Sequence, residues 1–125
     1  MFKLFSHKKL FFIIDDDEDL TFLMSKKLKD EFYCNVKSFH CLKDAVVNLQ
    51  ISTPDFILCD VKMPGENGFH LGKHLKGLPQ MVPVIYVTAL SNPEDVSDEV
   101  RIISKPINFD RLFKMIKFNL GDFEY

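Results

Sequence analysis

The sequence has no long apolar run and few of the residues that break regular structure. Its longest unbroken apolar run, LFFII, covers residues 10–14, whereas a membrane-spanning helix needs roughly 20 such residues and a secretory signal also needs more than five. The chain has only 5 glycines and 6 prolines among 125 residues, and 46% of its residues are hydrophobic, which is unlike a disordered or collagen-like chain. We therefore expect a folded domain with neither a membrane span nor an export signal.

Cysteines and clustered basic residues are also scarce. Cys34, Cys41 and Cys59 lack CxxC spacing and would leave one thiol unpaired in any disulfide scheme, which favours a reducing cytoplasm. We expect these cysteines to be small core residues, with Cys59 buried in a strand. Lysine and arginine are scattered, so the clustered basic patch typical of nucleic-acid binding is absent, and we expect no nucleic-acid partner.

The length of 125 residues predicts one domain. Residues 1–8 precede the first credible strand and are expected to form an N-terminal tail, which leaves residues 9–125 as the domain. Apolar runs of strand length follow at residues 10–14, 34–39, 56–59, 82–87 and 100–103.

Apolar residues at helical spacing lie between and after these runs. The first stripe is Leu20, Leu23, Met24, Leu28 and Phe32, with Glu18 or Asp19 as the expected cap. The other stripes are Ala45, Val46 and Leu49, ended at Thr53-Pro54; Phe69, Leu71 and Leu75, closed near Gly77; and Phe109, Leu112, Phe113, Ile116 and Leu120, stopped by Gly121. Alternating strands and helices predict a doubly wound α/β domain with a parallel sheet.

Polar groups follow the predicted strands at the points where a parallel sheet binds ligands. The first strand ends in Asp15-Asp16, the third in Asp60 and the fourth in Thr88, and Lys105 follows the fifth. Carboxylates that meet at one edge repel one another, so we expect them to recruit Mg²⁺, which prefers oxygen ligands. A lysine and a hydroxyl beside them would neutralise and hydrogen-bond phosphoryl oxygens, so the pattern predicts phosphoryl transfer.

With these residues the sequence resembles the receiver domain of two-component response regulators, over about residues 9–120. The matching stretches are FFIIDDDEDL, PDFILCDVKMPGENGF, VPVIYVTAL and ISKPINFDRL. The resemblance implies a five-stranded parallel sheet in the flavodoxin-like order 2-1-3-4-5. It also implies a phosphorelay protein whose partners are a sensor histidine kinase or a histidine phosphotransfer protein and an unknown downstream protein.

The resemblance implies a role for each matching residue. Asp60 would accept the phosphoryl group, and Asp15 and Asp16 would be the acid pair that holds Mg²⁺. Asp16 and Asp60 would bind the ion directly, with the backbone carbonyl of Lys62 as a further ligand. Thr88 and Lys105 would contact the phosphoryl group, and Pro106 resembles a cis-proline that aims the lysine. Asp17, Glu18 and Asp19 are assigned to capping and to the dipole of the first helix.

The chain departs from the family pattern between Thr88 and Lys105. Only residues 89–104 separate them, so we expect a shortened or irregular fourth helix there. Ile102 stands where receivers often carry a switching Tyr or Phe. We therefore expect that phosphorylation does not drive the common receiver dimer through this face, and that a stand-alone receiver signals through protein contacts instead.

Two alternatives remain open from the residues. A haloacid-dehalogenase-type phosphohydrolase would use the Asp15-x-Asp17 motif, the Thr-terminated strand VIYVT and Lys105, but it leaves Asp60 without a role. A receiver-fold adaptor would bind a partner without phosphorylation. In the main interpretation the chain is no enzyme on a separate substrate, since it assists only its own phosphorylation and dephosphorylation.

Overall fold

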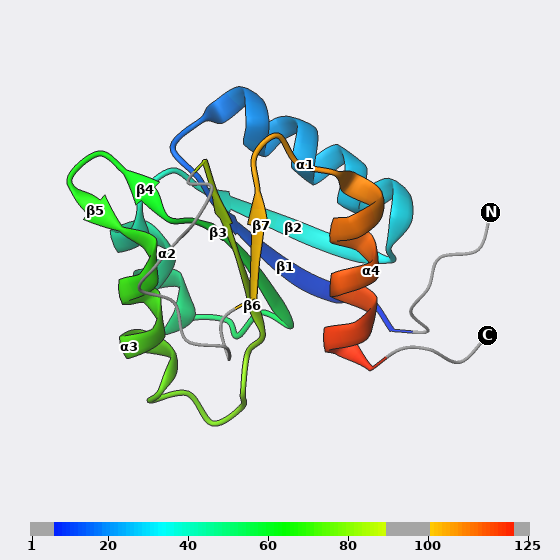
Figure 1. The fold of residues 1–125 in the computed structure, drawn as a ribbon. Coiled ribbons are helices and arrows are strands. Elements are labelled where there is room, and N and C mark those ends of the chain that lie inside the picture. The colour runs from blue at the N-terminus through cyan, green and yellow to red at the C-terminus, as the bar shows by residue number, and fades with distance from the viewer. Residues whose placement is uncertain (1–6, 90–100, 122–125) are drawn as a thin grey trace.

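A computed structural model describes residues 7–89 and 101–121 of the chain (Figure 1). Five strands form one parallel sheet in the order β2-β1-β3-β6-β7, which confirms the predicted flavodoxin-like arrangement. The strands are β1 (Lys9–Ile14), β2 (Cys34–Phe39), β3 (Phe56–Asp60), β6 (Val84–Thr88) and β7 (Arg101–Ser104). The winding reverses beside β1, so the crevice between the ends of β1 and β3 is where this topology favours a ligand.

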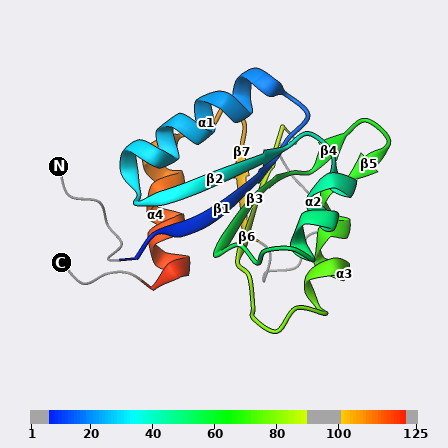
Figure 2. The same cartoon turned by 180° about the vertical axis from the view of Figure 1, so that it is seen from behind.

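Helices cover both faces of the sheet, as a parallel sheet requires (Figures 1 and 2). On one face lie α1 (Glu18–Glu31) and α4 (Phe109–Leu120); on the other lie α2 (Leu42–Leu49), a 3₁₀ turn (Gly68–His70) and α3 (Leu71–Leu75). The shortened or irregular helix predicted between Thr88 and Lys105 is a different segment from α4, and it falls on residues 90–100, which lie outside the described ranges.

The two sides of the sheet form separate apolar cores. Phe11, on the α1 and α4 side, is fully buried and makes edge-to-face contacts with Phe32 and Phe56 at centroid distances of 5.7 and 5.5 Å. Phe12 faces the other core and packs on Phe39. Each buried ring of this kind contributes about 1.5 to 3 kcal/mol to folding, so the central strands are the stable base that positions their own carboxyl ends.

The start of α1 differs in part from the prediction: the cap is Asp17, one of the three acids assigned to capping and to the helix dipole, and not Glu18 or Asp19. Asp17 is the N-cap, with extended backbone angles, and its carboxylate accepts a hydrogen bond from the Leu20 N–H at 3.0 Å; Glu18 and Asp19 lie in the first turn. A cap must stand outside the helix with non-helical backbone, and only Asp17 does so. The predicted apolar stripe is also wrong at Leu23, which is 42% exposed, because the buried face instead contains Thr21, Met24 and Leu28.

Several element boundaries also differ slightly from the prediction. Strand β6 begins at Val84 and not at residue 82, because Pro83 has no N–H to contribute to the ladder, although its carbonyl still accepts from Ile57. Helix α2 ends at Leu49, before the predicted break. Helix α4 has the predicted bounds, and Gly121 terminates it with a φ of +67°.

A short antiparallel ribbon follows β3 and was not predicted. Its strands, β4 (Lys62–Met63) and β5 (Glu66–Asn67), are joined by a turn in which Gly65 has a φ of +70°. Figures 1 and 2 show this ribbon beyond the carboxyl ends of the parallel strands, on the side of the sheet that carries α2 and α3. Two-residue strands give no alternating pattern from which to predict them.

Candidate functional site

The register of the sheet brings the predicted site residues to one edge. Ile14 pairs with Cys59 across β1 and β3, so the residues that follow them, Asp15 and Asp60, lie side by side. Thr88 ends the neighbouring strand β6, and its carbonyl accepts a hydrogen bond from the Lys105 N–H at 2.8 Å. The Lys105–Pro106 peptide bond is cis.

Asp15 and Asp60 are buried carboxylates. Asp15 is 1% exposed and Asp60 is 5% exposed. One carboxylate oxygen of Asp15 accepts a hydrogen bond from the Asp17 N–H at 2.9 Å. Asp16 is exposed, yet one oxygen each from Asp15, Asp16 and Asp60 lies within 4.8 Å of the others. The three acids therefore form one compact cluster of oxygen donors.

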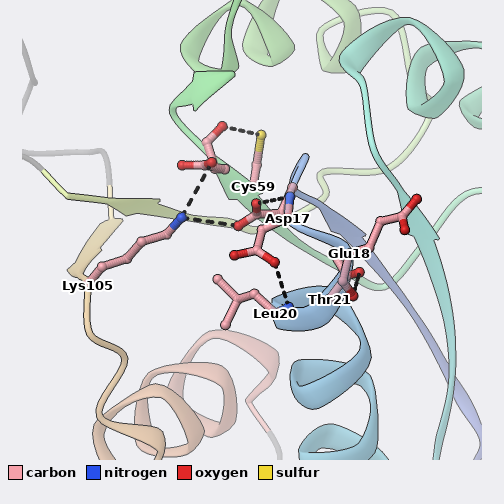
Figure 3. Close-up of polar contacts among 8 residues, drawn as sticks. Asp17, Glu18, Leu20, Thr21, Cys59 and Lys105 are labelled. Carbon is pink, nitrogen blue, oxygen red and sulfur yellow. Dashed lines mark hydrogen bonds and ion pairs between the residues drawn. The ribbon is translucent and has the colours of Figure 1, made fainter. Parts of the chain in front are cut away.

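Lys105 supplies the positive charge that faces this cluster. Its Nζ lies 3.3 Å from Oδ2 of Asp15 and 3.5 Å from Oδ2 of Asp60. Figure 3 shows its side chain extending from the strand end, with dashed lines from its nitrogen to two carboxylates. Burial lowers the pKa of Lys105, but Asp15 and then Asp60 raise it by more, and the result is a pKa above the usual value. Lys105 is therefore a permanent cation at neutral pH.

One lysine does not fully compensate two buried carboxylates. Burial, followed by the nearby charge of Asp15, raises the pKa of Asp60 to about 6, although Lys105 and a hydrogen bond from the Lys62 backbone N–H both lower it. The ionised form of Asp60 is thus less favourable here than in water, although a pKa of about 6 leaves the carboxyl mostly ionised at neutral pH. A divalent cation at the three-carboxylate cluster would relieve this repulsion, so both the donor set and its charge fit Mg²⁺.

Thr88 is 1% exposed at the end of β6. Lys62 lies two residues beyond Asp60 in β4, and its side chain is exposed. All six residues singled out from the sequence, namely Asp15, Asp16, Asp60, Lys62, Thr88 and Lys105, therefore belong to this edge of the structure or to the ribbon next to it.

Sequence reasoning missed Gly68, which packs against the backbone of Asp60 and Val61. A Cβ at Gly68 would overlap the backbone carbonyl oxygen of Asp60, and the Gly68 N–H donates to the Val61 carbonyl at 2.7 Å. Cys59 is buried as predicted, and its thiol contacts the carbonyl oxygen of Asp60 at 3.3 Å. Burial, then the charges of Asp60 and Asp15, raises the pKa of Cys59, so the thiol stays neutral. Nothing in the sequence distinguished Gly68 from an ordinary turn glycine.

The phosphohydrolase alternative needs Asp17 as a second catalytic acid. In the structure the Asp17 carboxylate accepts from the Leu20 N–H and caps α1, while Asp60 is the acid that lies beside Asp15. The geometry thus places the second acid on β3 and not two residues along the chain.

The fold and the site together define a doubly wound α/β domain with an acidic cluster at the carboxyl edge of its sheet. A family profile for the response regulator receiver domain matches residues 11–117. The chain belongs to the receiver-domain family of two-component response regulators.

Curated relatives include longer regulatory proteins. The transcriptional regulatory protein ZraR of Salmonella typhimurium is 29% identical over 80% of this chain and 24% of its own length. The response regulator PleD of Caulobacter vibrioides is 32% identical over 84% of this chain and 24% of its own length. The chain spans about a quarter or less of the length of the first curated relatives it matches.

Solved structures show the same fold. The signal receiver domain of a putative LuxO repressor protein from Vibrio parahaemolyticus has a TM-score of 0.80 at 22% identity, with 92% of each chain covered. The receiver domain of a signal transduction histidine kinase from Syntrophus aciditrophicus has a TM-score of 0.77 at 28% identity, with 93% of this chain and 92% of that chain covered. Among the described residues, no helix has the length and apolar character needed to cross a bilayer.

Proposed function

We propose that this domain is a phosphoacceptor receiver in which Asp60 takes a phosphoryl group from a sensor histidine kinase or a histidine phosphotransfer protein. One observation supports this most strongly: the buried Asp60 carboxylate lies beside a second buried carboxylate, Asp15, and the cation of Lys105 contacts both. Such a site attracts a divalent cation, and that cation together with Lys105 would favour an incoming group that carries negative oxygens.

The transfer itself needs little covalent assistance from the protein. A carboxylate oxygen of Asp60 forms a bond to phosphorus as the bond from phosphorus to the donor's imidazole nitrogen breaks, and that nitrogen keeps the electron pair. Lys105, 3.5 Å from Asp60, neutralises negative charge on the phosphoryl oxygens, and the Thr88 hydroxyl donates to one of them. The product is an aspartyl phosphate, a mixed anhydride that water hydrolyses, so the signal is limited in time.

Asp15, Asp16 and Asp60, with the backbone carbonyl of Lys62, are the residues that would hold Mg²⁺. When bound, the ion offsets the charge of the carboxylates and of the phosphoryl oxygens. Asp15 accepts from the Asp17 N–H, which orients its carboxylate toward the cluster.

The phosphorylated domain then acts through protein contacts and transforms no separate substrate. Cys34, Cys41 and Cys59 are free thiols, which supports a reducing cytoplasm as its location.

The test is incubation with acetyl phosphate, with and without MgCl₂, followed by intact-mass measurement. We expect one phosphoryl adduct per chain that requires Mg²⁺ and is absent from Asp60→Asn. The matched control is Asp19→Asn, which removes an exposed acid of the same acidic run outside the three-carboxylate cluster and should leave the adduct unchanged.

No adduct on the wild-type chain with Mg²⁺ present would contradict the proposal and favour a phosphorylation-independent adaptor. An adduct that persists in Asp60→Asn and disappears in Asp15→Asn would favour the phosphohydrolase instead.

A further inference from the structure

Glu66 of the β4–β5 ribbon forms a long-range hydrogen bond with helix α2. Its Oε1 accepts from the Leu42 N–H at 2.9 Å, in a partly buried position and across 24 residues of sequence. Leu42 is the first residue of α2, whose first N–H groups have no partner within the helix. The N-cap, Cys41, makes no side-chain hydrogen bond to α2. Glu66 therefore serves as a cap supplied from another part of the chain, and its negative charge suits the N-terminal end of the helix dipole.

The same ribbon begins beside the phosphoacceptor. Lys62 lies two residues after Asp60 and pairs with Asn67 in the ribbon, as Met63 pairs with Glu66. The ribbon is short, with two residues in each strand, and two-stranded ribbons are marginally stable in isolation. Its position relative to Asp60 thus depends on its attachments.

Two attachments hold the ribbon at its ends. At one end the chain continues directly from Asp60, and at the other the Gly68 N–H donates to the Val61 carbonyl. In β4 the Met63 side chain is also buried in the core on the α2 side of the sheet. None of these contacts is made by a side chain of β5. Glu66, the first residue of β5, follows the turn around Gly65, and its bond to Leu42 ties β5 to a helix packed on the sheet.

We infer that Glu66 is a positioning residue for the cation site: by joining the ribbon to the N-terminus of α2, it holds the Lys62 backbone at the distance from Asp60 that metal binding requires. This inference rests on the proposed function for the ligand set, and it concerns Glu66, to which neither the sequence pattern nor the family resemblance assigned a role.

The test measures Mg²⁺ affinity directly, by titration calorimetry on the full chain without any phosphodonor. We expect Glu66→Ala to weaken Mg²⁺ binding about tenfold, at the lower end of what loss of a group supporting a metal ligand costs. Glu66→Gln keeps an oxygen acceptor for the Leu42 N–H and should bind Mg²⁺ within about twofold of the wild type, since the bond and not the charge is what positions the ribbon.

A matched control distinguishes loss of the Glu66–Leu42 hydrogen bond from a general loss of stability in α2. Asp44 is an exposed acid in the first turn of the same helix. Asp44→Ala removes a charge that also favours the α2 dipole, so it should lower thermal stability without changing Mg²⁺ affinity. Hydrogen exchange at the Leu42 amide should become faster in Glu66→Ala and remain slow in Asp44→Ala.

The donor side of the bond gives a second pair of variants. Leu42→Pro removes the N–H at a helix position that accepts proline, and Cys41 before it already has extended backbone angles. Leu42→Ala removes the same packing but keeps the N–H. We expect Leu42→Pro to weaken Mg²⁺ binding more than Leu42→Ala, and Glu66→Ala to have little further effect in the Leu42→Pro background.

Wild-type Mg²⁺ affinity in Glu66→Ala, or an equal loss in Glu66→Gln or in Asp44→Ala, would overturn the inference. If Glu66→Ala does not fold, the comparison of Leu42→Pro with Leu42→Ala decides, and equal affinities in that pair would overturn it. Failure of the proposed function alone is a separate result, because it would appear as Mg²⁺ bound by the wild type without an adduct on Asp60, whereas no Mg²⁺ binding by the wild type would overturn both.

Discussion

The middle of the central strands and their carboxyl ends bury side chains of opposite kinds. In β1 and β3 the strand interior buries Phe11, Phe12 and Phe56, whereas the ends bury Asp15 and Asp60. Burial stabilises the first group because apolar surface leaves water, and it destabilises the second because charge leaves water. The apolar strand interior therefore offsets the unfavourable free energy of burying two carboxylates at the edge of the sheet.

The largest expected effect is in the strand interior. Phe11→Ala should lower the free energy of unfolding by about 3 to 5 kcal/mol, because the ring contacts both Phe32 and Phe56 and its loss leaves a cavity. Urea denaturation measures this loss. A loss below about 1 kcal/mol would show that the apolar interior is not the base on which the edge depends.

Removing the buried carboxylate of Asp60 should instead raise the free energy of unfolding at high pH. The pKa of Asp60 is about 6 in the folded chain and 3.8 in the reference state, so the folded chain binds more protons between these values. The free energy of unfolding therefore falls as pH rises from about 4 to about 6, by at most about 3 kcal/mol from this group without metal. Asp60→Asn should remove this step and be more stable than the wild type at pH 8.

Urea denaturation of the two proteins from pH 4 to 8 in EDTA measures that difference, and the other acids cancel between them. Saturating Mg²⁺ should reduce the wild-type step. An Asp60→Asn protein less stable than the wild type at pH 8 in EDTA would show that the buried carboxylate is already fully compensated.

Lys105→Met tests how far the lysine compensates the buried acids, because it removes the only cation paired with Asp15 and Asp60 among the described residues. We expect a loss of about 2 kcal/mol at pH 8, less than for a fully buried pair because the lysine side chain is 27% exposed. The pKa of Asp60, followed by NMR of its carboxyl carbon, should rise further. In the Asp60→Asn background the same substitution should cost less, and an equal cost in both backgrounds would separate Lys105 from Asp60 energetically.

The smallest effect concerns an exposed acid of the same edge. Asp17 caps α1, so Asp17→Ala should lower the free energy of unfolding by about 1 kcal/mol, while Asp17→Asn should be nearly neutral. Thermal unfolding of both variants measures this. Two aspartates two residues apart, Asp15 and Asp17, would then differ in role because one is buried with the cluster and the other faces a helix terminus; a stabilising Asp17→Ala would contradict that division.

Local patterns were enough to predict the elements with strong periodicity. Helix α4 was predicted with its bounds and its terminal Gly121, since its apolar spacing is regular and glycine readily adopts positive φ. The sheet order was predicted from a family resemblance, and the gathering of Asp15, Asp60, Thr88 and Lys105 at one edge followed from their positions after parallel strands.

Prediction failed where neighbouring positions were locally equivalent or where the partner was distant in the sequence. Asp17, Glu18 and Asp19 are all acceptable caps, and the path of the chain leaving β1 selects Asp17. Leu23 fits a helical stripe, but the rotation of α1 against the sheet buries Thr21 instead. The bond between Glu66 and Leu42 joins residues 24 apart, which no local pattern reveals.

By itself, the sequence determined which strands are buried, which polar residues follow them, and that these residues would share one edge. Apolar runs predict buried strands, and their alternation with helices predicts that the strands run parallel. Tertiary structure alone decided that Lys105 lies between two carboxylates, that the pKa of Asp60 rises, and that Glu66 holds the ribbon to α2. These properties depend on distances and on exclusion of water, which exist only once segments far apart in the chain have packed together.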